Sequence, residues 1–287
     1  MSEAGRPFPQ PVEVEHDGLR IAALDWGGGD APLLLLHPNG FNAGFFDPVA
    51  RRLAGGGRFR PVGVDLRGHG GSDKPPPPDP YRYELMAADV AAVLDALGLE
   101  DVAVVGGSLG GGVAIHLDRL HPGRLRRLML CEAIAWPLLE GRSPENPMVA
   151  TALRRRVVWP SRAEMIASYG ARPPLDRLAP EALKAYVEWG TVLREDGTVE
   201  LSCPPEVEAA IFGSPPVVEG VRAAWEHLAH LSAPAVVAAG AGSPLATEWF
   251  QEQAERAGAP FVLIDGGHFF FHEDTGRAVA LVTEHLA

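Results

Sequence analysis

A serine at the tip of a glycine-rich turn is the residue of this sequence best placed to do chemistry. Val102–Gly112 reads VAVVGGSLGGG, in which an apolar run leads into Gly106-Gly107-Ser108-Leu109-Gly110 and a helical stretch follows. Gly-x-Ser-x-Gly between a strand and a helix is the pattern of a nucleophile elbow, where a side chain at either outer glycine would crowd the strained serine. The N–H groups at the start of the helix then point to where an oxyanion would form. The alternative is a glycine-rich turn in which Ser108 only caps the helix.

A serine nucleophile needs a base, and His268 is the best candidate among the ten histidines. It follows the last predicted strand, in Asp265-Gly266-Gly267-His268. Ser108 also follows a strand, and the carboxyl ends of parallel strands share one edge of a sheet. We therefore expect the two side chains to meet at this edge. His272 is the one rival, although it already lies within the following turn.

The elements that would position these residues alternate along the chain. Short apolar runs predict strands at Val12–Glu15, Leu19–Trp26, Pro32–His37, Arg60–Leu66, Val102–Val105, Arg127–Glu132, Ala233–Gly240 and Pro260–Asp265. Helical patterns lie between most of them, which predicts an α/β fold with a doubly wound, mostly parallel sheet.

One long segment breaks this alternation. Between about residues 133 and 220 the chain holds three tryptophans, many prolines and helix-like pieces, and no strand stands out. We therefore expect an α/β core domain made of residues 1–134 and 221–287. Residues 135–220 form a helical cap, or lid, inserted after the strand that follows the nucleophile helix.

Composition excludes several other classes of function. The net charge of −12 and the absence of a basic stripe argue against a nucleic-acid partner, and Arg154–Arg156 is interpreted as a solvated helix face. No apolar run is long enough to span a membrane, and the first residues show no secretory signal, so a cytoplasmic protein is expected. Cys131 and Cys203 have no metal-type spacing. No metal and no organic cofactor is expected. The sequence does not decide whether the protein forms a homodimer.

Four motifs, taken together, resemble the α/β-hydrolase superfamily in order and spacing. They are His37-Pro38-Asn39-Gly40, Asp65-Leu66-Arg67-Gly68-His69-Gly70-Gly71-Ser72, the elbow Gly106–Gly110, and Gly267-His268. The resemblance covers nearly the whole chain outside the cap. It implies that one N–H group of the first motif joins that of Leu109 as the oxyanion hole. Pro38, where the family usually has glycine, has no N–H group. Asn39 is therefore the expected second donor, with Gly40 and Phe41 as alternatives.

The third member of the triad departs from the family pattern. The superfamily usually places its acid in a Gly-x-x-Asp turn after the strand before the last, and here that turn reads Gly240-Ala241-Gly242-Ser243. Either the acid is lost, or it comes from Glu132, which directly follows another predicted strand. Some haloalkane dehalogenases and lipases of the superfamily supply the acid from that position. A glutamate after the apolar Leu128–Leu130 is costly to bury without a partner, so Glu132 is the expected acid.

The resulting hypothesis is a serine hydrolase, most simply a carboxylesterase for small apolar or aromatic esters. Ser108 attacks, His268 transfers the proton and Glu132 orients the imidazole. The same triad would also suit a lactonase, amidase, thioesterase or carbon–carbon bond hydrolase, and loss of the acid would suit a weakly active binding protein. Phe41 is expected to border the substrate. Several cap residues either line an apolar pocket or merely pack the cap: Trp136, Leu138, Leu139, Trp159, Met165 and Tyr169.

Overall fold

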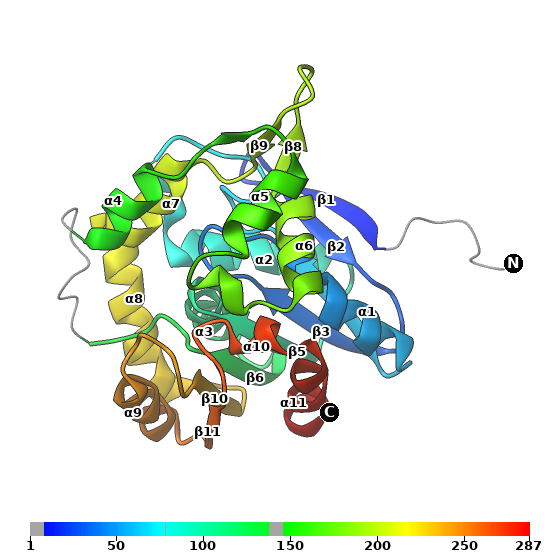
Figure 1. The fold of residues 1–287 in the computed structure, drawn as a ribbon. Coiled ribbons are helices and arrows are strands. Elements are labelled where there is room, and N and C mark those ends of the chain that lie inside the picture. Colours follow the sequence, from blue (N-terminus) through cyan, green and yellow to red (C-terminus); the bar gives the residue numbers. More distant parts are fainter. Residues whose placement is uncertain (1–8, 78, 138–145) are drawn as a thin grey trace, which may run out of the picture.

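An eight-stranded sheet forms the centre of the computed structural model, which describes residues 9–77, 79–137 and 146–287 (Figure 1). The strands lie in the order β1-β2-β4-β3-β5-β6-β10-β11. β1 pairs antiparallel with β2, and β2 antiparallel with β4, while the other neighbours pair parallel. The strands are β1 (Gln10–His16), β2 (Leu19–Asp25), β3 (Ala31–Leu36), β4 (Phe59–Val64), β5 (Val102–Gly107), β6 (Leu125–Cys131), β10 (Ala235–Gly240) and β11 (Phe261–Ile264). The predicted doubly wound, mostly parallel sheet is confirmed.

Helices cover both faces of this sheet, which explains why its inner strands are continuously apolar. Leu33–Leu36 of β3 are fully buried, as expected of a strand with a helix layer on either side. One layer contains α1 (Asp47–Gly55) and α11 (Thr275–Leu286), with the short α10 (Phe270–Glu273) beside them. The other contains α2 (Tyr83–Ala96), α3 (Leu109–Leu120), α8 (Pro215–His227) and α9 (Thr247–Ala257). Single turns η1 (Ala43–Phe46), η2 (Asp79–Tyr81) and η4 (Leu228–His230) complete the core.

The cap lies between β6 and α8 and has its own small core. Its elements are α4 (Pro147–Leu153), β7 (Val158–Trp159), α5 (Arg162–Tyr169), η3 (Leu175–Arg177), α6 (Pro180–Trp189), β8 (Thr191–Leu193), β9 (Val199–Leu201) and α7 (Pro205–Gly213) (Figure 1). Aromatic and aliphatic residues of α5 and α6 pack on Phe41 and Phe45 of the core domain. Among the described helices, none has the length and apolar character that crossing a membrane requires.

The expectation that the cap contains no strand is wrong. β7, β9 and β8 pair antiparallel in a three-stranded sheet. Each strand has only two or three residues, which is too short to show the alternation that marks a strand in a sequence. The expected boundary after residue 220 also falls inside α8, because that helix begins at Pro215.

Candidate active site

Ser108 stands at the turn between β5 and α3, in a backbone conformation that few residues other than glycine adopt. Its φ is 52° and its ψ is −114°. Its N–H group donates to the carbonyl of Cys131 at 2.9 Å, which ties the turn to β6. A Cβ on Gly106 would lie 2.7 Å from the Gly110 carbonyl oxygen, and one on Gly110 would lie 2.3 Å from that of Leu36. The steric reason predicted for both glycines of the elbow is therefore present.

A buried carboxylate lies beside His268. Glu132 directly follows β6, and its side chain is 0% exposed. Its Oε2 lies 2.5 Å from Nδ1 of His268, which follows β11. The N–H group of Gly240 donates to Oε1 at 2.8 Å. These donors compensate for the loss of water around the charge, so the structure places Glu132 against His268 as the sequence predicts.

Ser243 occupies the position where the family resemblance places the acid, and it contacts the acid instead of replacing it. Its Oγ donates to Oε2 of Glu132 at 2.7 Å. The contact is possible because β6 and β11 are the two neighbours of β10, so the loops after these three strands meet at one edge. From the sequence, Ser243 counted only as a departure from the pattern. Its role as a hydrogen-bond donor to Glu132 was not foreseen.

Ser108 and His268 line one small cavity at this edge of the sheet. The wall also contains Pro38, Phe46, Val105, Gly107, Cys131, Phe269, Phe271 and His272. Most of these residues are apolar, which strengthens electrostatic interactions inside. The cavity has a volume of about 10 Å³, enough for one water-sized group. Both side chains thus face the same cavity, although among the described residues no hydrogen bond joins Ser108 Oγ to His268.

Backbone N–H groups of the loop after β3 were the expected source of the second oxyanion donor. Gly40 donates its N–H to Nε2 of His69 at 3.0 Å, and Phe41 donates its N–H to the Pro38 carbonyl at 3.1 Å. Among the residues that the structure describes, no acceptor is found for the backbone N–H of Asn39 or of Leu109. These two groups were the predicted oxyanion donors, and the two alternatives are already engaged.

Known proteins share the sequence pattern and the fold of this chain. A sequence model of the alpha/beta hydrolase fold matches residues 31–275. This chain belongs to the α/β hydrolase fold family. In sequence it is similar to a non-heme chloroperoxidase of Kitasatospora aureofaciens, at 34% identity over 138 residues that cover 48% of each chain. The chain thus spans about half the length of curated relatives of this kind.

Solved structures of α/β hydrolases extend the similarity over the whole chain. E-2-(acetamidomethylene)succinate hydrolase superposes with a TM-score of 0.82 at 20% identity, covering 97% of this chain and 99% of that one. At such identity the likeness shows the fold alone. An esterase of Mycobacterium tuberculosis superposes with a TM-score of 0.74 at 26% identity, covering 98% of this chain and 93% of that one.

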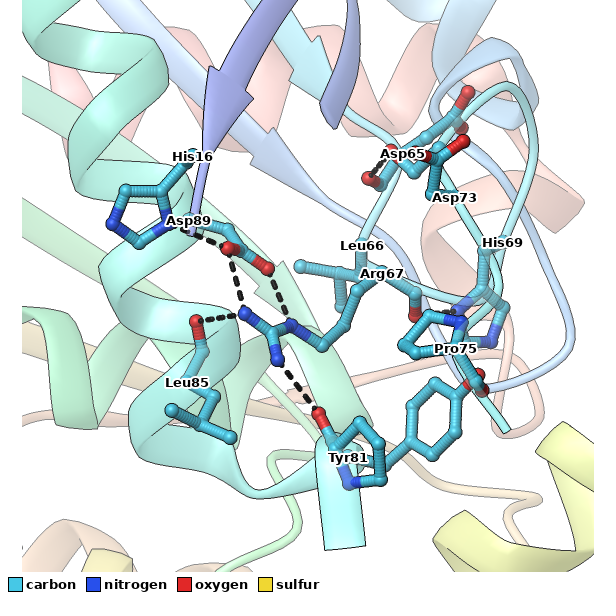
Figure 2. Close-up of polar contacts among 12 residues, drawn as sticks. His16, Asp65, Leu66, Arg67, His69, Asp73, Pro75, Tyr81, Leu85 and Asp89 are labelled. Carbon is cyan, nitrogen blue, oxygen red and sulfur yellow. Dashed lines mark hydrogen bonds and ion pairs between the residues drawn. The ribbon is translucent and has the colours of Figure 1, made fainter. Parts of the chain in front are cut away.

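In this α/β hydrolase, a buried ion pair anchors the loop that carries His69 (Figure 2). Arg67 donates from Nε and Nη2 to the two carboxylate oxygens of Asp89 on α2, at 2.6 and 2.8 Å. Its Nη1 also donates to the Pro80 carbonyl at 2.9 Å, and His16 contacts the same carboxylate. Asp89 is 0% exposed, so removing the guanidinium would leave a buried charge with too few partners.

Two buried histidines connect this loop to the loop after β3. Nε2 of His37 accepts the N–H of Leu66 at 3.0 Å, and Nε2 of His69 accepts the N–H of Gly40. Burial lowers the pKa of His37 to about 4 and holds the pKa of His69 well below its ordinary value. A ring nitrogen accepts a hydrogen bond only when it is unprotonated. The lowered pKa values therefore keep both contacts in place at neutral pH.

A carboxylate of α10 holds the turn that carries His268. Glu273 accepts the N–H of Gly267 at 3.0 Å, and Arg177 of the cap donates to the same carboxylate at 3.1 Å. The sequence offered no signal for this contact beyond the closeness of residues 267 and 273. The cap and the turn before His268 thus share one ion pair.

Through Arg155 the cap also reaches Gly40 in the loop after β3. The interpretation of Arg154–Arg156 as a solvated face is wrong at Arg155, which pairs with Glu208 of α7 and donates to the hydroxyl of Tyr186 at 2.8 Å. The Tyr186 hydroxyl in turn donates to the carbonyl of Gly40 at 3.3 Å. Arg155 can leave solvent because Glu208 and Tyr186, which lie far from it in the sequence, accept its hydrogen bonds.

The residues predicted to contact substrate pack against other parts of the protein. Phe41 stacks near Tyr186 and Phe269, with ring centroids 4.5 and 4.9 Å away. Trp159 is buried in the cap core, and Trp136 packs on Phe250 and another tryptophan of α9. The three are not among the cavity-lining residues given above, so their contact with substrate stays a prediction. Leu138 and Leu139 lie outside the described residues.

No group of three metal-ligating side chains that would suit a metal ion occurs within residues 9–77, 79–137 and 146–287. At this edge of the sheet the described residues supply a hydroxyl, an imidazole, a buried carboxylate and two backbone N–H groups.

Proposed function

We propose that this α/β hydrolase cleaves small carboxylic esters through an acyl-enzyme on Ser108. The observation that carries the proposal is the 2.5 Å contact between Glu132 and His268 at a cavity that His268 shares with Ser108. A hydroxyl, an imidazole and a buried carboxylate in that order form the arrangement that activates a serine nucleophile. The similarity to a mycobacterial esterase supports ester substrates.

Each residue then has a defined part in the reaction. His268 takes the proton of Ser108 through Nε2 as Oγ attacks the acyl carbon, and Glu132 holds the other ring nitrogen in its protonated form. The N–H groups of Asn39 and Leu109 stabilise the oxyanion, at about 3 kcal/mol per donor. His268 next protonates the leaving alcohol. It then activates a water molecule that releases the acid and regenerates Ser108.

The small cavity favours a short acyl group. The space beside Ser108 is narrow, with a volume of about 10 Å³, so short acyl groups are the first to test. The same chemistry would act on a lactone or thioester of similar size. Esters remain the first substrates to test because one of the structurally similar proteins is an esterase.

The experiment compares hydrolysis of 4-nitrophenyl acetate and octanoate by the wild type and by Ser108→Ala. We expect turnover of the acetate with a marked preference over the octanoate, and no turnover above background for Ser108→Ala. A fluorophosphonate probe should label the wild type at Ser108, as located by peptide mass spectrometry. A folded wild type that neither turns over nor takes the label would refute the proposal and favour a ligand-binding role.

A further inference from the structure

Both backbone groups of Gly267, the residue directly before His268, are held in place. The Gly267 N–H donates to both carboxylate oxygens of Glu273, at 3.0 Å to Oε1 and 3.1 Å to Oε2. Its carbonyl oxygen accepts the N–H of Phe270 at 3.1 Å, and a Cβ on Gly240 would lie 2.2 Å from that oxygen. Among these contacts, the side chain of Glu273 is the one that a substitution can remove.

Gly240, the last residue of β10, also contacts the acid of the candidate triad. Its N–H donates to Oε1 of Glu132 at 2.8 Å, while Oε2 of Glu132 lies 2.5 Å from Nδ1 of His268. The acid is thus fixed relative to β10, and its contact with the imidazole persists only if the turn that carries His268 keeps its distance from β10. A displacement of this turn on the order of 1 Å would break a hydrogen bond of that length.

Two contacts from the cap hold Glu273 and the helix α10 on which it lies. Arg177 of η3 donates from Nε to Oε2 of Glu273 at 3.1 Å, and the N–H of Ala179 donates to the His272 carbonyl at 3.0 Å. The side chain of Glu273 is 12% exposed, whereas that of Arg177 is 50% exposed. An ion pair with one half-exposed member adds little to the stability of the whole protein. Its effect is local, because a charge-assisted hydrogen bond orients the carboxylate on Gly267.

We propose that Glu273 is a positioning residue for His268, and that its ion pair with Arg177 keeps the carboxylate on the Gly267 N–H. The cap then contributes to the reaction through the turn that carries the base, without touching the substrate. This inference rests on the proposed acyl transfer at Ser108 and deepens it by naming residues that act through His268.

Three variants separate the two contacts of Glu273. Glu273→Leu removes both, Glu273→Gln keeps a carbonyl oxygen for the Gly267 N–H but loses the charge that faces Arg177, and Arg177→Met removes the partner in the cap. In kcat for 4-nitrophenyl acetate we expect Glu273→Leu to lose about 10- to 100-fold, because misplacing a reacting group by about 1 Å has an effect of this size. Glu273→Gln and Arg177→Met should each lose about two- to fivefold, and the double variant no more than either. KM should stay within about twofold, because neither residue lines the cavity with Ser108.

Glu181→Gln and Arg172→Met are the matched controls. Glu181 also links the cap to the core, because the hydroxyl of Thr275 donates to it at 2.8 Å, but its described contacts do not include the turn before His268. Arg172 is an exposed arginine of the cap. Both controls should retain kcat within about twofold. Equal losses in Glu181→Gln and Arg177→Met would mean that any loosening of the cap lowers activity, and this would overturn the inference.

A spectroscopic measurement separates positioning from a purely structural role and does not depend on turnover. In protein labelled with ¹⁵N-histidine, the proton between Nδ1 of His268 and Glu132 should give a strongly downfield ¹H resonance, as expected for a contact of 2.5 Å. The resonance should be lost in Glu273→Leu, while thermal unfolding still shows a folded protein, and it should persist in both controls.

The outcomes distinguish this inference from the proposed function. If a folded Glu273→Leu variant keeps the resonance and loses less than about threefold in kcat, the inference fails while the proposed function stands. If that variant does not fold, an unchanged kcat in both Glu273→Gln and Arg177→Met overturns the inference. If the resonance is lost as expected but the wild type hydrolyses no ester, the proposed function fails while the positioning of His268 stands.

Discussion

Replacing Glu132 with glutamine gives the sharpest test of the candidate triad. All three groups that contact the carboxylate donate to it: His268, Ser243 and the N–H of Gly240. Glutamine has one acceptor oxygen and one NH₂ donor. If its NH₂ faces His268, the imidazole must place its proton on Nε2 and no longer accepts from Ser108. If its NH₂ faces Gly240, two donors confront each other in a fully buried site.

The first orientation therefore disables the base, and the second lowers the stability of the folded protein. For the first, the analogous loss in serine proteases is about 10⁴-fold in kcat, which corresponds to about 5.5 kcal/mol in the activation barrier. We expect a loss of this order in kcat for 4-nitrophenyl acetate. KM should change little, because the carboxylate does not touch the substrate.

The matched control is Glu248→Gln, an exposed carboxylate on α9 and the first one after Ser243 in the chain. It should retain activity within about twofold, since a surface substitution away from the site has little effect. Thermal unfolding of both variants separates a catalytic loss from a folding loss. A folded Glu132→Gln variant that loses less than tenfold in kcat would refute the assignment of the acid.

Three further predictions follow from other contacts. Ser243→Asp, assayed on the same ester, should lower activity at pH 7, because the buried carboxylate of Glu132 would repel a second carboxylate beside it. Increased activity of this variant would contradict the role of Glu132. Gly110→Ala should lower the free energy of unfolding by at least about 1–3 kcal/mol in urea titrations, because its Cβ would lie 2.3 Å from a β3 carbonyl oxygen. Burial lowers the pKa of His37 to about 4 and that of His272 to about 3 in the folded protein. At pH values below the ordinary pKa of histidine, the unfolded state therefore binds more protons than the folded state. Stability should therefore fall as pH drops from about 6.5 toward 4, by up to about 1.4 kcal/mol per pH unit for each ring, and His272→Phe should reduce that slope in denaturant titrations at several pH values.

Features that depend on local pattern can be predicted from the sequence alone. The elbow around Ser108 follows from glycine spacing and from the apolar run before it, because both act through contacts between near neighbours. The alternation of strands and helices sets the sheet, and the sheet brings the ends of parallel strands to one edge. That is why His268 was predictable as the partner of Ser108 without any knowledge of distances.

Features that depend on partners far apart in the chain can be seen only in the three-dimensional structure. Glu132 and His268 are separated by 136 positions, and whether the side chains meet depends on which strands are neighbours in the sheet. The same dependence explains why Ser243 is a donor to Glu132 and why Arg155 of the cap is largely withdrawn from solvent beside Glu208 and Tyr186. In each case burial selects the partner, because a charged or polar group leaves water only where another chain segment supplies its hydrogen bonds.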